Sequence, residues 1–156
     1  MVREKLELPL TFPFATEFQV RIDDVNYGGH LGNASVLTVV HEARLRFLSD
    51  FGFSEKDVDG VGMIMSDAVL IFKAEAFHWD VLAVEVAVAN IGRHGCDFLY
   101  RITRTKDAKE IARAKTGLVF FDYERRKVAR TPNKFKEIFA YALSPEETDG
   151  ETTKEA

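Results

Sequence analysis

The chain of 156 residues contains a single cysteine, Cys96, so it has no internal disulfide bond and suits a reducing compartment. It also lacks an excess of basic residues, because 21 Lys and Arg face 25 Asp and Glu, for a net charge of -4. This balance argues against a nucleic-acid-binding protein, which usually carries a basic stripe. No apolar run resembles a signal peptide or reaches the length of a membrane span. We therefore expect a soluble, cytoplasmic protein.

Apolar residues, in contrast, are plentiful. They make up 46% of the chain and include 13 Phe, which is enough to bury a substantial core. A chain of this length fits one domain, to which we assign residues 1–143. The remaining residues, 144–156, are polar and acidic, and we expect them to form a disordered tail.

Apolar periodicity predicts a strand followed by a long helix. Apolar and polar residues alternate over 15–22, which places Phe18, Val20 and Ile22 on one face of a strand. Steps of three and four residues then predict a helix over 34–51 with a broad apolar face. Asn33 is expected to be its N-cap, and Gly52 stands where a C′ glycine ends a helix.

Further strands with short turns are predicted after this helix. They cover residues 61–72, 81–91, 96–105 and 111–121. Serial strands of this kind favour an antiparallel meander. Thr131-Pro132 then indicates an N-cap and first residue of a short closing helix. One apolar helix that must be buried and several antiparallel strands together predict an α+β fold.

One loop, between the first strand and the helix, concentrates reactive side chains. It reads Asp23-Asp24-Val25-Asn26-Tyr27-Gly28-Gly29-His30-Leu31-Gly32-Asn33. A helix N-terminus offers N–H groups without intrahelical acceptors, and glycines let a ligand carbonyl approach them closely. Such groups can hold the oxyanion of an acyl-transfer reaction. The positions expected to bind this oxyanion or the substrate are Gly29, Leu31, Gly32 and Asn33.

Two carboxylates of the same loop, Asp23 and Asp24, could attack a carbonyl carbon or activate water. Asn26 and His30 could orient the water or the substrate carbonyl. On the residues alone, a purely structural turn is the simpler interpretation, because Asp-x-Asn and Gly-Gly are common in turns.

The sequence resembles a known family at Asp24-Val25-Asn26, at His30-Leu31-Gly32-Asn33 and at Glu42-Ala43 with Leu48 on the helix. These motifs resemble the 4-hydroxybenzoyl-CoA thioesterase-like branch of the hotdog superfamily, especially bacterial acyl-CoA thioesterases and plant acyl-ACP thioesterases. The resemblance extends over about residues 14–139 and includes the order of the elements. It implies the hotdog fold, in which an antiparallel sheet wraps around a long central helix.

The resemblance also implies a function. A protein of this family would hydrolyse the thioester of an acyl-CoA or acyl-ACP to a free acid and a thiol. Coenzyme A would enter only as part of the substrate, and no separate cofactor is expected. The family forms homodimers and homotetramers, and dimerisation would also cover an unpaired sheet edge.

By the same resemblance, Asp24, Asn26 and His30 match polar residues of the plant enzymes' loop. Glu75 matches an acid of those enzymes, but Ala76 replaces the cysteine that follows it there, which excludes a thiol mechanism at this position. Asn26 also stands where many bacterial relatives keep their catalytic aspartate, and the loop has two more residues before His30 than the plant pattern.

The catalytic carboxylate could therefore be Asp24, Glu75 or Glu42. Glu42 matches a glutamate common in the family's helix. Its simpler interpretation is an ion pair with Arg46, four residues further along the helix.

The phosphates of coenzyme A call for cations, and Arg93, Arg125 and Arg126 are candidates, with solvated turn charges as the alternative. The four histidines show no metal-ligand spacing, so we expect no metal. Two other functions stay open. One is a hotdog-type enoyl-CoA hydratase, whose motif has a proline where Tyr27 stands here. The other is a non-catalytic acyl-CoA-binding module.

Overall fold

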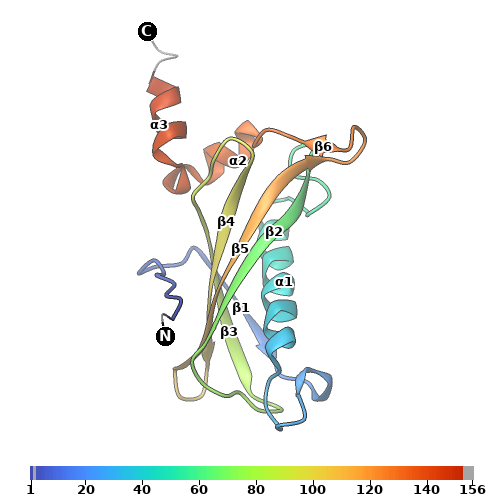
Figure 1. Cartoon of the computed structure of the whole chain (residues 1–156), viewed down its shortest axis with the longest axis vertical. Helices are drawn as coiled ribbons and strands as arrows, with labels where there is room; N and C mark the ends of the chain where they lie inside the picture. Colours follow the sequence, from blue (N-terminus) through green and yellow to red (C-terminus); the bar gives the residue numbers. More distant parts are fainter. Residues whose placement is uncertain (2, 153–156) are drawn as a thin grey trace. The chain divides into compact units, whose positions relative to one another are not determined.

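The computed structural model describes residue 1 and residues 3–152, with side chains described up to residue 148. Its elements, labelled in Figure 1, are β1 (Phe14–Gln19), η1 (Ile22–Asp24), α1 (Asn33–Asp50), β2 (Gly62–Phe72), β3 (Val81–Ala89), β4 (Gly95–Arg104), β5 (Lys109–Asp122), β6 (Lys127–Val128), α2 (Asn133–Ile138), η2 (Ala140–Ala142) and α3 (Pro145–Thr152). Over the described residues, no helix has the length and apolar character needed to span a membrane.

The strands form one six-stranded sheet with the order β1-β3-β4-β5-β2, and β6 pairs with β5. β1 is antiparallel to β3, with Phe14 opposite Val86 and Gln19 opposite Val81. The predicted meander is confirmed for β3, β4 and β5, which are neighbours in sequence and in the sheet. It is wrong for β2, which lies beside β5 instead of β3. The mixture of one long helix and this sheet confirms the α+β class.

These elements are divided between two compact units. The first contains residues 1–47, 69–87 and 99–115. The second contains residues 48–68, 88–98 and 116–156. The whole loop between β1 and α1 belongs to the first unit. The assignment of residues 1–143 to a single domain stays a prediction.

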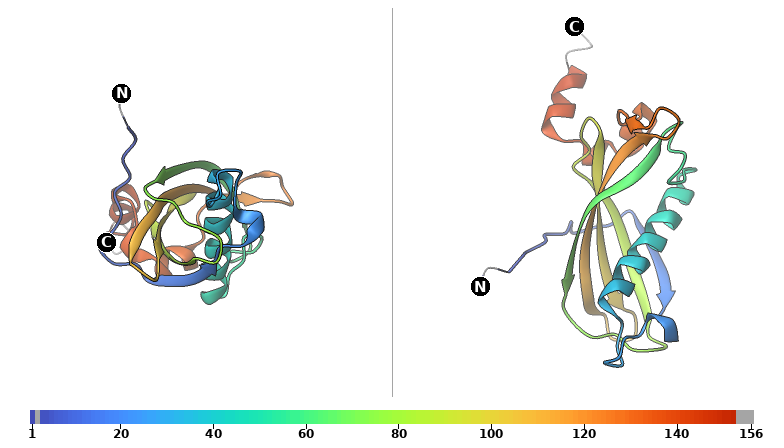
Figure 2. Two further views of the ribbon diagram at one scale, coloured as in Figure 1. Left: turned by 90° about the horizontal axis from the view of Figure 1, so that it is seen from below. Right: turned by 45° about the vertical axis from the view of Figure 1, so that its right-hand side comes forward.

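The core of the first unit is formed by α1 and the strands. The helix buries Val36, Val39, Val40, Ala43 and Phe47, and the strands bury Leu82, Val84, Val86, Tyr100, Ile102, Ala112 and Ala114. The ring of Phe14 on β1 meets the ring of Phe47 edge-on at 5.5 Å, and Figure 2 shows β1 running beside α1. Each buried side chain of this size stabilises the fold by about 1.5–3 kcal/mol, so the helix is firmly held.

The core of the second unit is rich in aromatic residues. Phe53, Phe98, Phe120, Phe135 and Phe139 are all buried there. At the end of α1, the Gly52 N–H donates to the Ser49 carbonyl at 3.0 Å and the Phe53 N–H donates to the Leu48 carbonyl at 2.8 Å. This pattern is a Schellman motif, and Gly52 has the positive φ of 79° that it requires. The predicted C′ glycine is confirmed.

Two details at the start of the chain differ from the prediction. β1 ends at Gln19, and Ile22 is 70% exposed in η1 instead of on the buried face of a strand. α1 begins with Asn33 itself, because the carbonyl of Gly32 accepts the first helical hydrogen bond from the Val36 N–H at 3.2 Å. Gly32, and not Asn33, is therefore the N-cap.

Two details near the end also differ. The N-cap of α2 is Pro132 instead of Thr131, because the Pro132 carbonyl accepts the first helical hydrogen bond from the Lys136 N–H at 3.1 Å. The Thr131 hydroxyl instead donates to the carbonyl of Gly92 at 2.6 Å. The sequence predicts a disordered tail over 144–156, whereas the structure has helix α3 at Pro145–Thr152. An ion pair between Lys136 and Glu147 connects this helix to α2. Residues 153–156 of the predicted tail lie outside the described residues.

Candidate active site

The loop between η1 and α1 is closed by its own hydrogen bonds. Val25 and Leu31 form an antiparallel bridge, and the Asn26 N–H donates to the His30 carbonyl at 2.9 Å. Inside this closure, the side-chain oxygen of Asn26 accepts a hydrogen bond from the Gly28 N–H at 2.9 Å. The Asn26 amide is thus compatible with the turn. Asn26 orients the loop backbone through its side chain.

His30 and Glu75 come together across two segments of the first unit. Nε2 of His30 lies 3.8 Å from Oε1 of Glu75, and Nδ1 of His30 lies 3.3 Å from the carbonyl oxygen of Leu31. The His30 side chain is 30% exposed and that of Glu75 is 64% exposed, so a ligand can reach both. A Cβ added at Gly28 would lie 3.2 Å from Nε2 of His30, so a side chain there would crowd the imidazole.

A hydrogen bond at the base of the loop explains why Glu75 lies beside it. The N–H of Leu31 donates to the carbonyl oxygen of Ala76 at 2.7 Å, and both residues are buried. Because Ala76 directly follows Glu75, this bond places the Glu75 carboxylate near the imidazole of His30. The structure therefore brings together Asn26, His30 and Glu75.

The predicted oxyanion donors divide into two groups. The N–H groups of Gly29, Leu31 and Gly32 already donate to the carbonyls of Asn26, Ala76 and Asp24, respectively. These bonds stabilise the loop and leave those three N–H groups unavailable to a ligand. The fourth candidate, Asn33, is different.

The N–H of Asn33 precedes the first intrahelical hydrogen bond of α1, which is made by Val36. The N–H groups of Ala34 and Ser35 also precede this bond. N–H groups in the first turn of a helix have no intrahelical acceptors. These three N–H groups lie at the positive end of the helix dipole. The candidate oxyanion site therefore moves from the loop to the first turn of α1.

The two aspartates that precede the loop have other partners. Oδ2 of Asp24 accepts a hydrogen bond from the Arg21 N–H at 2.8 Å, and the carbonyl of Asp24 accepts one from Gly32. Its carboxylate thus caps the short helix η1. Asp23 is exposed and lies 3.8 Å from Nε of Arg21.

Glu42 is not brought to this site. It lies nine residues after Asn33 on α1, which corresponds to about 14 Å along a helix. Its Oε1 pairs with Nε of Arg46 at 3.0 Å, and Arg46 also donates to the Thr16 hydroxyl and the Glu17 carbonyl. The ion pair suggested by the spacing is therefore present, and it ties the helix to β1.

The three candidate phosphate ligands belong to the second unit, whereas the loop belongs to the first. Arg93 lines a cavity of about 680 Å³ together with Arg130, Lys136, Glu146 and Glu147. A hydrogen bond from Lys136 lowers the pKa of Glu147, and the charges of Arg93 and Arg130 add to this effect. The other two candidates, Arg125 and Arg126, lie in the turn between β5 and β6.

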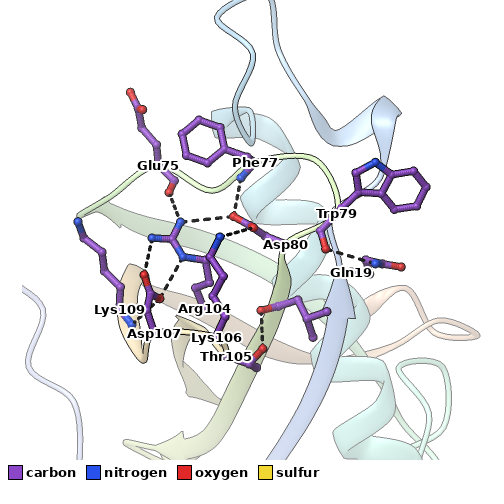
Figure 3. A network of polar contacts seen from close by, with 11 residues as sticks. Gln19, Glu75, Phe77, Trp79, Asp80, Arg104, Thr105, Lys106, Asp107 and Lys109 are labelled. Atoms are coloured by element: carbon purple, nitrogen blue, oxygen red, sulfur yellow. Dashed lines mark hydrogen bonds and ion pairs between the residues drawn. The ribbon is translucent and has the colours of Figure 1, made fainter.

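A cluster of charges lies behind the segment that carries Glu75 (Figure 3). Its centre is Arg104, which is only 8% exposed and contacts Asp80, Asp107 and the carbonyl oxygen of Glu75. Hydrogen bonds from Arg104 lower the pKa of Asp107 to about 2. Burial acts to raise the pKa of Asp80, but the Phe77 N–H and the cations Lys106 and Arg104 outweigh it, so this pKa is lowered.

The sequence reasoning missed this cluster, although one signal was present. Alternation along β4 places Arg104 on the same face as Phe98, Tyr100 and Ile102, all of which are buried. A charged residue in register with a buried face needs partners, because an unpaired buried charge is very costly. Within the described part of the chain, no group of three or more His, Cys, Asp or Glu side chains could hold a metal ion.

Comparisons with known proteins agree with this fold and loop. The family model of the thioesterase-like superfamily matches residues 20–139. The chain therefore belongs to the thioesterase-like superfamily, a class of thioester hydrolases, and its α+β architecture is the hotdog fold of that class. A search of curated proteins finds no match.

Solved structures of this class superpose well on the chain. A 1,4-dihydroxy-2-naphthoyl-CoA thioesterase from Synechocystis is 26% identical, with a TM-score of 0.74 over 81% of this chain and 95% of the other. A DHNA-CoA thioesterase from Staphylococcus aureus is 23% identical, with a TM-score of 0.68 over 74% and 78%. A putative thioesterase from Pseudomonas aeruginosa is 16% identical, with a TM-score of 0.74 over 82% and 98%. The last two likenesses concern the fold alone.

Proposed function

We propose that the protein is an acyl-CoA thioesterase, which hydrolyses the thioester of an acyl-CoA to a free acid and a thiol. The observation that carries this proposal is the pairing of His30 with Glu75, 3.8 Å apart, in the loop that leads into α1. An acid–base pair next to open helix N–H groups is what hydrolysis of a thioester carbonyl needs. Membership of the thioesterase-like superfamily supports the same chemistry.

The reaction follows from these positions. A water oxygen adds to the thioester carbonyl carbon while its proton passes to Glu75, directly or through the imidazole of His30. The carbonyl oxygen becomes an oxyanion, which accepts hydrogen bonds from the N–H groups of Asn33, Ala34 and Ser35. The tetrahedral intermediate then collapses, the C–S bond breaks, and the departing thiolate takes up the proton. Asn26 keeps the loop in shape, and Asp24 serves as a cap instead of a nucleophile.

Coenzyme A is the proposed leaving thiol, and no cofactor or metal takes part. One of the structural relatives is named for 1,4-dihydroxy-2-naphthoyl-CoA, which makes aromatic acyl-CoAs the first group to test. The thioester of an acyl carrier protein has the same reacting bond and is a second group. For the phosphates of coenzyme A, Arg93, Arg125 and Arg126 are the proposed contacts.

A thiol-release assay on the purified full chain tests the proposal, with aromatic and aliphatic acyl-CoAs and an acyl carrier protein thioester as substrates. Saturable release of free thiol from at least one substrate is the expected result. Hydration of an enoyl-CoA without thiol release would instead identify the hydratase, and saturable binding without turnover would identify a binding module. Either of those results overturns the proposal, as does the lack of thiol release from every substrate.

We also propose that the protein assembles into a homodimer or homotetramer in the cytoplasm. β1 and β2 are the two end strands in the sheet order, and β2 has exposed apolar side chains at Ile64 and Met65. An exposed apolar edge strand is a template for pairing with another chain. Light scattering coupled to gel filtration tests this assembly, and a monomeric mass at micromolar concentration would contradict it.

A further inference from the structure

Arg104 uses every nitrogen of its guanidinium group. Nε and Nη2 donate to the two carboxylate oxygens of Asp107 at 3.0 and 2.9 Å. Nη1 donates to the carbonyl oxygen of Glu75 at 3.0 Å and to Oδ2 of Asp80 at 3.3 Å. Asp107 thus fixes the plane of the guanidinium, and Nη1 is left to hold the segment 75–80 (Figure 3).

The second contact of Nη1 extends into this segment. Oδ2 of Asp80 also accepts a hydrogen bond from the Phe77 N–H at 2.9 Å, and the Asp80 N–H donates to the Phe77 carbonyl at 3.0 Å. The segment is therefore folded into a tight turn. Ala76, the residue before Phe77, lies between the Glu75 carbonyl and the Phe77 N–H, and the cluster fixes both of these groups.

Ala76 is the residue whose carbonyl oxygen accepts the Leu31 N–H at 2.7 Å. Leu31 follows His30 and precedes the N-cap of α1, so this one bond connects the clamped segment to both parts of the candidate site. Glu75 itself extends from the same segment, with its carboxylate 3.8 Å from His30. The path from Arg104 to the site thus runs through two hydrogen bonds and the backbone between Glu75 and Ala76, all within the first unit.

We infer that Arg104 is a positioning residue, which sets the distance between Glu75 and His30 and the direction of the first turn of α1 by clamping segment 75–80. It does not touch substrate in this arrangement, because its guanidinium is buried and already bonded. Arginine suits this role because its planar fork binds a carboxylate with two nitrogens while a third reaches a carbonyl. Lysine carries a single point charge and cannot hold both the Asp107 carboxylate and segment 75–80.

A matched control exists in the same unit. Arg113 also pairs through two nitrogens with a carboxylate three residues away, that of Glu110, and its Nη1 donates to a carbonyl oxygen, that of Leu6, at 3.0 Å. Replacing either arginine by lysine removes the same kinds of bonds. Of these two arginines, Arg104 is the one that bonds segment 75–80 directly, so the pair Arg104→Lys and Arg113→Lys separates positioning from general stabilisation.

The test combines amide hydrogen exchange by NMR with steady-state kinetics. In Arg104→Lys, we expect exchange of the Leu31 amide to accelerate about tenfold or more relative to Arg113→Lys, with the Phe53 amide as reference. We expect kcat to fall roughly ten- to hundredfold while KM changes much less, because misplaced acid–base groups slow the chemical step. Arg113→Lys should keep both values near those of the wild type.

The turnover part of this inference rests on the proposed thioesterase activity, and the exchange part does not. If no acyl thioester is hydrolysed by the wild type, the proposed function fails and Leu31 exchange alone decides the inference. Equal Leu31 exchange in the two variants overturns it, and so does faster exchange with an unchanged kcat. If Arg104→Lys does not fold, Asp80→Asn replaces it, because this change weakens the same clamp and the same outcomes apply.

Discussion

The N–H of Leu31 and the carbonyl oxygen of Ala76 are 2.7 Å apart, and this hydrogen bond joins the loop before α1 to the segment before β3. It has two consequences for the candidate site. It removes the Leu31 N–H from the possible oxyanion donors, and it brings the Glu75 carboxylate to His30.

Deleting the N–H of Asn33 should impair catalysis without unfolding the helix. Proline is well tolerated at the first residue of a helix, where its missing N–H has no intrahelical partner. Asn33→Pro removes the proposed donor, whereas Asn33→Ala removes only the side chain. We expect kcat to be roughly a hundredfold or more lower in the proline variant than in the alanine variant, because one oxyanion donor typically contributes this much. Equal kcat values for the two variants would exclude the Asn33 N–H as a donor.

The three candidate carboxylates should differ in their effect on turnover. Glu75→Gln keeps the size of the side chain but removes the base, so kcat should fall by about a hundredfold or more. Glu42→Gln should change kcat less than about twofold, because Glu42 pairs with Arg46 on the surface of α1 and such pairs contribute little. Kinetics with the best acyl-CoA substrate measure both.

Asp24→Asn completes this comparison. An amide oxygen can still accept the Arg21 N–H, so kcat should stay within a few-fold of wild type if Asp24 is only a cap. Loss of turnover in Asp24→Asn together with normal turnover in Glu75→Gln would instead assign the carboxylate role to Asp24.

A methyl group added at Gly52, at the end of α1, should lower the stability of the protein. Gly52 has a φ of 79°, a conformation that costs an alanine about 1–2 kcal/mol. Gly52→Ala should therefore lower the free energy of unfolding by about this amount in urea titrations. Gly92→Ala is the control, since the nearest heavy atom to an added Cβ lies 4.0 Å away there. A similar loss in both variants would show that the Schellman motif is not the cause.

Stability should decrease in acid as the cluster around Arg104 loses its charges. The pKa of Asp107 is lowered from 3.8 to about 2 by Arg104, and that of Asp80 is also lowered. A lowered pKa contributes stability that is present above about pH 4 and is lost as the pH falls through about 2. Thermal unfolding between pH 7 and pH 2 should thus show a falling Tm.

The contribution of Asp107 can be isolated in the same experiment. Asp107→Asn should have a lower Tm than wild type at pH 7, and the difference should shrink towards pH 2. A difference in Tm that does not change with pH would contradict the role of the Asp107 charge.

Local patterns predicted the elements well. The period of the apolar residues located α1, and the strand patterns over 96–105 and 111–121 located β4 and β5 to within about two residues. Gly52 was recognised because a helix end requires a residue that tolerates positive φ. The ion pair of Glu42 with Arg46 followed from helical spacing. All of these depend on residues close together in the sequence.

The errors concern interactions that local patterns do not contain. β2 pairs with β5, which no periodicity within β2 specifies. The hydrogen bond from the Arg21 N–H to the Asp24 carboxylate depends on the turn of η1, which the sequence pattern did not predict. Likewise, the N–H groups of Gly29, Leu31 and Gly32 donate to carbonyl oxygens that the sequence pattern did not identify. The proximity of Glu75 to His30 depends on Leu31 and Ala76, which are far apart in the chain.

The clamp by Arg104 also sets an order of events during synthesis. The loop that ends at Gly32 leaves the ribosome long before Arg104, which lies 29 residues after its acceptor Glu75. At about 5–20 residues per second, roughly 4–14 s pass between the synthesis of this loop and that of the arginine that fixes segment 75–80. Throughout that interval the nascent chain carries its loop residues without the arginine that aligns them with Glu75.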